Sequence, residues 1–296
     1  MADPDPHVQP GPEADPNADR GPERDPDHDP DRDRDRDPDA GRSLLPDVRA
    51  VAALAPFGWL ALGWRDFRAH PLPSMFYGAC FAIMGWLIVM TFRHAYEYVS
   101  ALVTGFFLVG PFLAIGLYAL SRRRERGEPA WLAPTLDAWL PNAGAIGMFS
   151  LVLAVILLVW ARASLIVFAL FYTSSMPSIA GFLGQLLTLD NLEFLFAYFC
   201  VGGFFAVLVF AISVVSVPMM LDRDTDGIVA VLTSLKAFAA NIRAMAVWGL
   251  AISVIVAAGF ALFFAGLVVA VPVIGHATWH AYRALVADAE PVAPMP

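Results

Sequence analysis

The sequence predicts an all-α membrane protein with about six transmembrane helices and amphipathic interfacial helices on the cytoplasmic side. Three observations support this prediction. Hydrophobic residues make up 58% of the chain and charged residues only 16%, and the mean hydropathy is +0.61, which is well outside the range of soluble domains. The apolar residues gather in runs long enough to cross a hydrocarbon core of about 30 Å. Arginines concentrate in alternate loops between these runs, as expected for cytoplasmic loops.

The first 43 residues are an acidic tail, rich in Asp, Pro and Arg, that we expect to be disordered. Residues 1–42 hold 14 acidic and 6 basic groups, so they carry the whole net charge of −8. This composition buries too little apolar surface to fold. We interpret the tail as a solvated extension, with a docking or cation-sequestering arm as the alternative. A polytopic membrane domain is predicted over residues 44–286, followed by a disordered end at 287–296.

Four apolar runs predict single transmembrane helices. A fifth run, residues 244–275, extends for 32 residues without a charge and would be about 48 Å long as one helix. We therefore predict two helices, 244–262 and 266–285, joined by a turn near 263–266. This gives six spans rather than five. The other predicted spans are residues 75–92, 98–120, 144–160 and 194–219.

The distribution of arginine predicts the orientation. The loop after the second span holds four arginines, and the segment between spans four and five holds three basic residues, whereas the opposite loops are poor in Lys and Arg. By the positive-inside rule both basic segments lie in the cytoplasm. Both termini of a six-span chain are then cytoplasmic, in a bacterial inner membrane. The basic residues are Arg122, Arg123, Arg124 and Arg126, followed by Arg223, Lys236 and Arg243.

An amphipathic stretch precedes each pair of spans. The three stretches read "PFGWLALGWRDFRAHP", "PAWLAPTLDAWLPNAG" and "GIVAVLTSLKAFAANIRAM". Helices of this kind lie in the plane of the membrane interface. The third stretch places apolar residues on one helix face, and these are Ile228, Val231, Leu235, Phe238 and Ile242.

Arg162 interrupts the apolar run that ends the third span. Beside Trp160, at the predicted outer end of the span, its side chain is expected to snorkel to the lipid headgroups. The alternative is a substrate-facing charge paired with Asp190 or Glu193.

The segment "DRDTDG" resembles the opening of a calcium-binding loop, with carboxylates at Asp222, Asp224 and Asp226. The twelfth position of such a loop requires a bidentate Glu, and here it is Thr233. A helix start explains the same residues, because Asp224 or Asp226 can cap free backbone N–H groups. We therefore interpret the three aspartates as structural.

His276 and His280 lie four residues apart and project from one helix face, so they could supply two ligands to zinc or copper. His70, predicted on the same side of the membrane, is the candidate third ligand. Two ligands about 6 Å apart on one face cannot lie on opposite sides of a haem. The alternative is a helix end in which Trp279 and Tyr282 belong to an aromatic belt and the histidines are hydrogen-bonded inside the bundle.

Three segments resemble a known family. They are "WLALGWRDFRAHPLPSMFYG", "SVPMMLDRDTDG" with the following "SLKAFAANIRAMAVW", and "PVIGHATWHAYR". In this order they are similar to a family of predicted bacterial integral-membrane proteins that is catalogued as a domain of unknown function, and the similarity covers residues 45–286. Some members are labelled as cytochrome c oxidase subunit I. That subunit uses twelve spans and six histidine ligands, whereas this chain has four histidines beyond the tail. The resemblance therefore implies membrane location and shared architecture, but no activity.

No catalytic motif is present in the sequence, and no basic surface interleaved with aromatic residues indicates nucleic acid. The interpretation that we favour is a non-enzymatic scaffold, assembly or accessory protein without a cofactor, whose partners are the lipid bilayer and other membrane proteins. The alternatives are a small-solute transporter and a metal-binding or redox protein that uses the C-terminal histidine pair.

Overall fold

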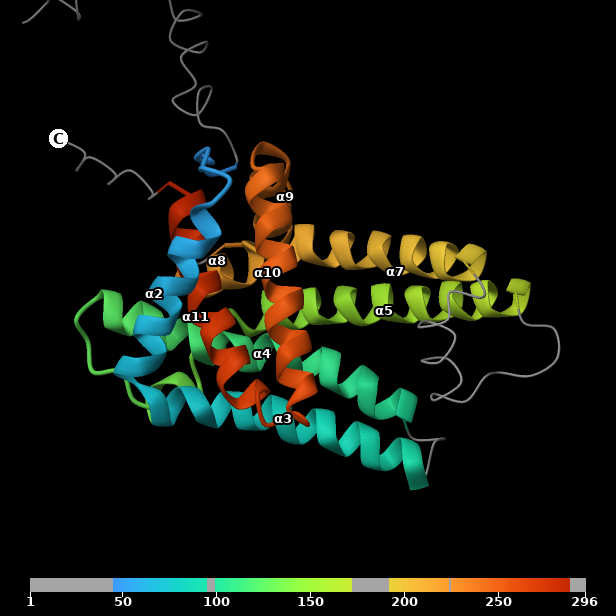
Figure 1. Cartoon of the computed structure of the whole chain (residues 1–296). Coiled ribbons are helices and arrows are strands. Elements are labelled where there is room, and N and C mark those ends of the chain that lie inside the picture. Colours follow the sequence, from blue (N-terminus) through green and yellow to red (C-terminus); the bar gives the residue numbers. More distant parts are fainter. Residues whose placement is uncertain (1–44, 95–98, 172–191, 224, 288–296) are drawn as a thin grey trace, which may run out of the picture. The chain divides into compact units, whose positions relative to one another are not determined.

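The computed structural model describes residues 45–94, 99–171, 192–223 and 225–287. The predicted tail at 1–43 and residues 288–296 of the predicted C-terminal end lie outside this part of the chain. All described helices belong to the unit Leu44–Pro296, which is shown in Figure 1.

The all-α class is confirmed, and each of the six predicted spans is helical. Within the described residues, the β-type pairing is a single bridge between Val48 and Val286. Two short 3₁₀ turns, η2 (Ala133–Thr135) and η3 (Leu140–Asn142), precede α5. The α-helices are α2 (Ala55–Ala69), α3 (Pro71–His94), α4 (Val99–Glu125), α5 (Ala143–Phe171), α7 (Leu192–Ser213), α8 (Ser216–Asp222), α9 (Gly227–Ala240), α10 (Ile242–Ala261) and α11 (Leu267–Leu285).

Four helical segments in the described part of the chain are long and apolar enough to cross a membrane. They are Pro71–Phe92, Ala133–Phe171, Leu192–Asp222 and Ile242–Ala261. The predicted second span, α4, and the predicted sixth span, α11, are not among these four segments of the described chain. The second half of α11 contains two histidines, a tyrosine and an arginine, which lower its hydropathy.

Helix α11 is the helix around which the neighbouring helices pack. It contacts α2, α3, α4 and α10, and Figure 1 shows it beside the blue α2. Two glycines allow the close approach of these helices. A Cβ atom on Gly63 of α2 would lie 2.6 Å from the carbonyl oxygen of Val273, and one on Gly78 of α3 would overlap the carbonyl group of Val268. Small residues at such contacts let helix backbones pack tightly.

The predicted turn between the last two helices is confirmed. Helix α10 ends at Ala261 and α11 begins at Leu267. Phe263 and Phe264 lie in the left-handed region, with φ of 49° and 66°, which is costly for residues with a side chain. The chain therefore reverses direction within five residues, and the long apolar run forms two helices rather than one.

Two of the predicted amphipathic helices differ from the expectation. Residues 129–144 form short 3₁₀ turns rather than one helix, because Pro134 and Pro141 lack backbone donors. The third stretch divides at Asn241 into α9 and α10, so Ile242 does not continue the face of α9.

The predicted apolar face of α9 is divided between core and surface: Val231 and Phe238 are half-buried and pack against the core, whereas Ile228 and Leu235 are exposed. Ile228 is 69% exposed and Leu235 is 36% exposed. The residues that α9 buries are small or hydroxylated: Ala230, Thr233, Ser234 and Ala237. Helix α9 therefore packs on the protein through these small residues together with Val231 and Phe238, and it exposes Ile228 and Leu235.

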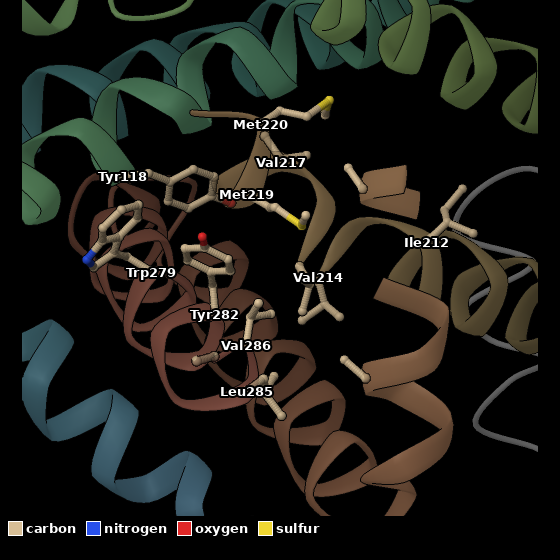
Figure 2. Close-up of a cluster of buried hydrophobic side chains, with 14 of the residues drawn as sticks. Tyr118, Ile212, Val214, Val217, Met219, Met220, Trp279, Tyr282, Leu285 and Val286 are labelled. Carbon is tan, nitrogen blue, oxygen red and sulfur yellow. The ribbon is translucent and has the colours of Figure 1, made fainter. Parts of the chain in front are cut away.

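The largest buried hydrophobic cluster surrounds the second half of α11. Figure 2 shows the side chains of Trp279 and Tyr282 facing Tyr118 of α4 and Met219 of α8. Trp279 and Tyr282 are at most 1% exposed. This packing fixes the end of α11 against the ends of α4 and α8, where most of the polar side chains described next are found.

Candidate functional site

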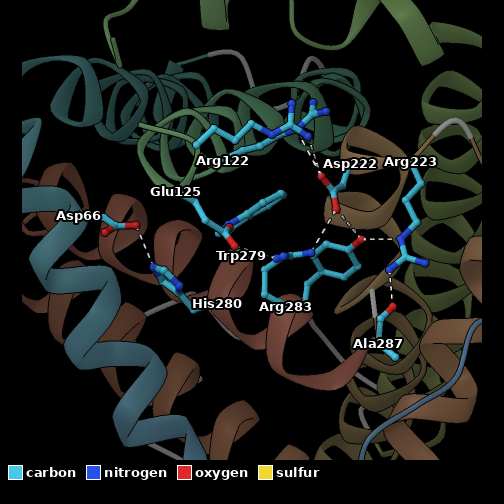
Figure 3. A network of polar contacts seen from close by, with 11 residues as sticks. Asp66, Arg122, Glu125, Asp222, Arg223, Trp279, His280, Arg283 and Ala287 are labelled. Atoms are coloured by element: carbon cyan, nitrogen blue, oxygen red, sulfur yellow. Dashed lines mark hydrogen bonds and ion pairs between the residues drawn. The ribbon is translucent and has the colours of Figure 1, made fainter. Parts of the chain in front are cut away.

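Polar side chains of α2, α3, α4, α8 and α11 meet around the second half of α11 in two adjacent groups. The first, which we call the Asp66 cluster, consists of Asp66, Ser74, Ser121, Arg124, His276 and His280. The second, which we call the arginine pocket, consists of Arg122, Glu125, Arg126, Asp222, Arg223, Trp279 and Arg283. Figure 3 shows parts of both groups.

Asp66 is the acceptor at the centre of the first group. It lies on the buried face of α2 that also carries Trp59 and Gly63, and it is 3% exposed. Its Oδ2 accepts a hydrogen bond from Ser121 Oγ at 2.7 Å and lies 2.9 Å from His280 Nε2. Its Oδ1 pairs with the guanidinium of Arg124. The buried carboxylate on α2 is therefore held by two other helices, α4 and α11.

The surroundings of Asp66 favour its charged form. Burial alone raises the pKa of a carboxyl group. The hydrogen bonds from His280 and Ser121, together with the electrostatic attraction of His280 and His276, outweigh burial and hold the Asp66 pKa below its usual value of 3.8. Asp66 is therefore ionised at neutral pH.

His276 lies between two serines inside the bundle, and it is 1% exposed. Its Nδ1 is 2.8 Å from Ser121 Oγ, and its Nε2 is 2.9 Å from Ser74 Oγ. Ser121 donates its proton to Asp66, and Ser74 donates to the carbonyl oxygen of His70 at 2.7 Å. A hydroxyl has one proton, so a serine that donates elsewhere can only accept a hydrogen bond from the ring. A neutral ring requires one serine to turn its proton toward His276.

Asp222, at the end of α8, organises the arginine pocket. Its Oδ1 lies 3.3 Å from Arg122 Nε and 3.6 Å from Arg126 Nη2. Its Oδ2 accepts a hydrogen bond from Tyr282 OH at 2.9 Å and lies 3.7 Å from Arg283 Nη1. These contacts join the C-terminal ends of α4, α8 and α11.

Two further contacts complete the pocket. Glu125 of α4 accepts a hydrogen bond from Trp279 Nε1 at 2.8 Å and another from Arg283 Nε at 3.0 Å. Arg223 donates to Tyr282 OH at 3.0 Å and to the carbonyl oxygen of Ala287 at 2.6 Å. Figure 3 shows Glu125 and Arg223 reaching α11 from opposite sides.

The three histidines predicted as metal ligands do not bring their side chains together. The side chains of His276 and His280 join the Asp66 cluster, whereas His70 contributes its backbone carbonyl. Among the residues that the structure describes, no group of three His, Cys, Asp or Glu side chains is arranged to hold a metal ion. Metal binding by His276 and His280 remains a hypothesis that would require displacing their hydrogen bonds to Ser74, Ser121 and Asp66. Metal content and the visible spectrum, compared between wild type and the His276→Ala, His280→Ala double variant, test it.

The three predicted aspartates have different environments. Asp222 is paired with arginines rather than aimed at a calcium site. Asp226 occupies the N-cap position of α9, but its side chain makes no capping hydrogen bond. Asp224 lies outside the described residues.

Arg162 lies farther from the helix end than expected. Helix α5 continues to Phe171 instead of ending near Trp160, so Arg162 precedes the helix end by nine residues. Its side chain is exposed. Neither Arg162 nor Glu193 has an ion pair within the described part of the chain, and Asp190 lies outside it.

Sequence reasoning missed the acceptors that organise both groups. Asp66 stands between Arg65 and Arg68 and resembles a surface residue. Its spacing from Trp59 and Gly63, at seven and three residues, is the signal that assigns it to the buried face of α2. Glu125 and Ser121 carry no comparable signal, because their roles depend on contacts with α11, more than 150 residues later.

The comparison with known proteins concerns the central part of the described chain. Residues 99–222 match the family described as predicted integral membrane protein DUF2189. The DUF2189 match covers α4, α5, α7 and α8, and so includes Arg122, Glu125 and Asp222. It supports the family resemblance over this range, which includes residues 216–222 of the second motif. The rest of that motif (223–227 and 234–248) and the motifs at 59–78 and 272–283 lie outside it. No curated protein and no solved structure matches the chain. With its apolar helices, the DUF2189 region identifies an integral membrane protein in contact with the lipid bilayer.

Proposed function

We propose that this chain is a non-enzymatic, multi-pass protein of the bacterial inner membrane that acts as a scaffold, assembly or accessory protein, with both termini in the cytoplasm. The observation that carries the proposal is the pairing of two carboxylates, the buried Asp66 and the half-buried Asp222. Asp66 and Asp222 are each engaged by arginine and by hydroxyl groups of other helices. Such pairing stabilises a helix arrangement and leaves neither carboxylate poised as a general base.

The outward faces of α5 and α7 support a role in binding other membrane proteins. These two helices pack against each other and present large apolar side chains outward. Leu158 of α5 is 54% exposed, and Phe196 and Phe199 of α7 are 74% and 59% exposed. A face of this kind is covered either by lipid or by another transmembrane helix.

Photo-crosslinking in the native membrane tests this proposal. A photoreactive residue is placed at Phe199 on α7, with Leu250 on α10, which is 67% exposed, as the matched control on another helix. A scaffold or accessory protein gives a discrete protein adduct from the face that binds its partner and none from the other. Adducts with lipid alone from both positions would contradict the proposal.

A second candidate function is proton-coupled transport of a small solute, which one observation favours. Asp66, Ser121 and His276 form a buried chain of hydrogen bonds whose protons can occupy alternative positions. Buried chains of Asp and His are used as proton relays in membrane transporters. Solute flux driven by a pH gradient in proteoliposomes, lost in Asp66→Asn and retained in Ser150→Ala, would support this candidate over the scaffold.

A further inference from the structure

The arginine pocket contains more positive than negative charge. It has a volume of about 450 Å³ and is lined by four arginines, two carboxylates and Trp279. Among the lining residues that the structure describes, arginines outnumber carboxylates by two, which leaves a surplus of positive charge at the pocket wall. This surplus matches the charge of a phosphate group, which carries about −1.5 to −2 as a monoester at neutral pH.

The arginines keep donors that can reach a ligand. The Arg126 side chain is 50% exposed and approaches Asp222 with one nitrogen at 3.6 Å, a distance beyond a normal hydrogen bond. Arg122 is 25% exposed and uses Nη1 to donate to the carbonyl oxygen of Leu221 at 3.0 Å. A guanidinium has five N–H donors in a planar fork that fits the oxygens of a phosphate. These contacts therefore leave capacity for an anion.

The pocket lies where apolar helix surface gives way to charge. Helix α4 is apolar up to Leu120 and then reads Ser-Arg-Arg-Arg-Glu. The candidate membrane span that contains α7 and α8 ends at Asp222. The ends of both segments are therefore expected at the level of the lipid headgroups, where basic pockets between helices bind phosphate-bearing lipids.

We infer that the arginine pocket binds a phosphate-bearing anion, supplied by the headgroup of an anionic lipid or by a free phosphate. Arg122 and Arg126 contact the phosphate oxygens, and Glu125 and Asp222 hold the arginines of the pocket in place. This inference does not depend on the proposed scaffold function, since a lipid or anion site is compatible with either candidate function.

The arginines also have a structural explanation that the experiment must separate from binding. Three helix C-termini meet here, and their free carbonyls favour nearby cations. Arg122 and Arg223 do donate to the carbonyl oxygens of Leu221 and Ala287. The Arg126 side chain donates to no main-chain carbonyl in the described structure, so Arg126→Gln removes pocket charge without removing such a side-chain bond.

Binding is measured with the full chain in detergent. One arm titrates inorganic phosphate by calorimetry. The other arm counts bound lipid by native mass spectrometry in the presence of phosphatidylcholine, phosphatidylglycerol or phosphatidic acid. We expect Arg126→Gln to weaken binding of the phosphate-bearing anion by about tenfold or more, the effect of losing one charge-assisted hydrogen bond.

Arg123→Gln is the matched control. Arg123 is on the same helix and has the same charge, but it pairs with Glu128 at 3.2 Å, outside the pocket. It should bind as wild type does. Glu125→Gln, which keeps an acceptor for Trp279 and removes one negative charge, should bind more tightly. If Arg126→Gln does not fold, Arg126→Ala in a Glu125→Gln background replaces it, and the same weakening relative to that background is expected.

The two arms distinguish the source of the phosphate. Binding of inorganic phosphate that depends on Arg126 identifies a free anion as sufficient, whereas Arg126-dependent binding of anionic lipid alone identifies a headgroup. Either result supports the inference. Equal loss in the Arg123 and Arg126 variants, or no preference for anionic lipid over phosphatidylcholine together with no phosphate binding, overturns it.

Discussion

The Asp66 cluster and the arginine pocket both lie against α11, but they differ in how far their charged side chains are buried and paired. In the Asp66 cluster, Asp66, Ser121 and His276 are each 3% exposed or less, and each is engaged by the others. In the pocket, Arg126 is half exposed and four arginines face two carboxylates. The comparison indicates that polar side chains that are buried and fully paired stabilise the fold. Exposed side chains with a surplus of one charge can instead bind a ligand.

The largest effect on stability is expected from Asp66→Ala. This substitution leaves Arg124 and His280 without their carboxylate and Ser121 without its acceptor. Removing one partner of a buried ion pair typically costs about 3–5 kcal/mol. Chemical denaturation in mixed micelles measures this loss. Asp66→Asn, which keeps an oxygen acceptor for Ser121, should destabilise the protein less. Equal stability of Asp66→Ala and wild type would contradict the stabilising role of the Asp66 cluster.

A smaller loss is expected from Ser121→Ala, which disconnects Asp66 from His276. Both partners lose a buried hydrogen bond, at a cost of about 1–3 kcal/mol. Ser150→Ala is the matched control, because Ser150 is also fully buried but its hydroxyl has no hydrogen-bond partner in the described structure. The control should be as stable as wild type or slightly more so, measured by the same denaturation. Similar losses in the two variants would mean that burial, and not the network, determines the cost.

The pH dependence of stability provides a third test. Because the pKa of Asp66 is lowered on folding, its ionised form stabilises the native state above about pH 4, and this contribution is lost as pH falls through the folded pKa. The difference in unfolding free energy between wild type and Asp66→Asn should therefore shrink between pH 6 and pH 3. A difference that stays constant over this range would show that Asp66 contributes through packing alone.

The smallest effect on stability is expected in the pocket. Arg126→Gln should change the free energy of unfolding by less than about 0.5 kcal/mol, because exposed ion pairs contribute little and Asp222 keeps Arg122 and Tyr282. The same denaturation measures this change. Together with the loss of anion binding expected above, this result would separate the two neighbouring regions most sharply. A large destabilisation would instead assign Arg126 to the structural network.

The sequence predicts local features of this fold better than it predicts contacts. Apolar run length locates all six long helices, and the break at 263–266 follows from the excessive length of one run. The end of α5 was misplaced because Arg162 resembles a boundary, although the apolar run continues to Phe171. The site is harder to predict. His276 and His280 are recognisable from their spacing. The groups that contact them come from helices about 155 to 214 residues earlier, and a single sequence does not show which distant residues are in contact.

The antiparallel bridge between Val48 and Val286 has a consequence for biosynthesis. Arg49 N–H donates to the carbonyl oxygen of Leu285, and Asn241 holds Val51 N–H at 2.8 Å. The first segment of the chain that the structure describes thus pairs with one of the last. Until α11 is made, α2, α3 and α4 lack the helix that they pack around, and Asp66 lacks both histidines. The packing of α2, α3 and α4 is therefore completed only once α11 has been synthesised.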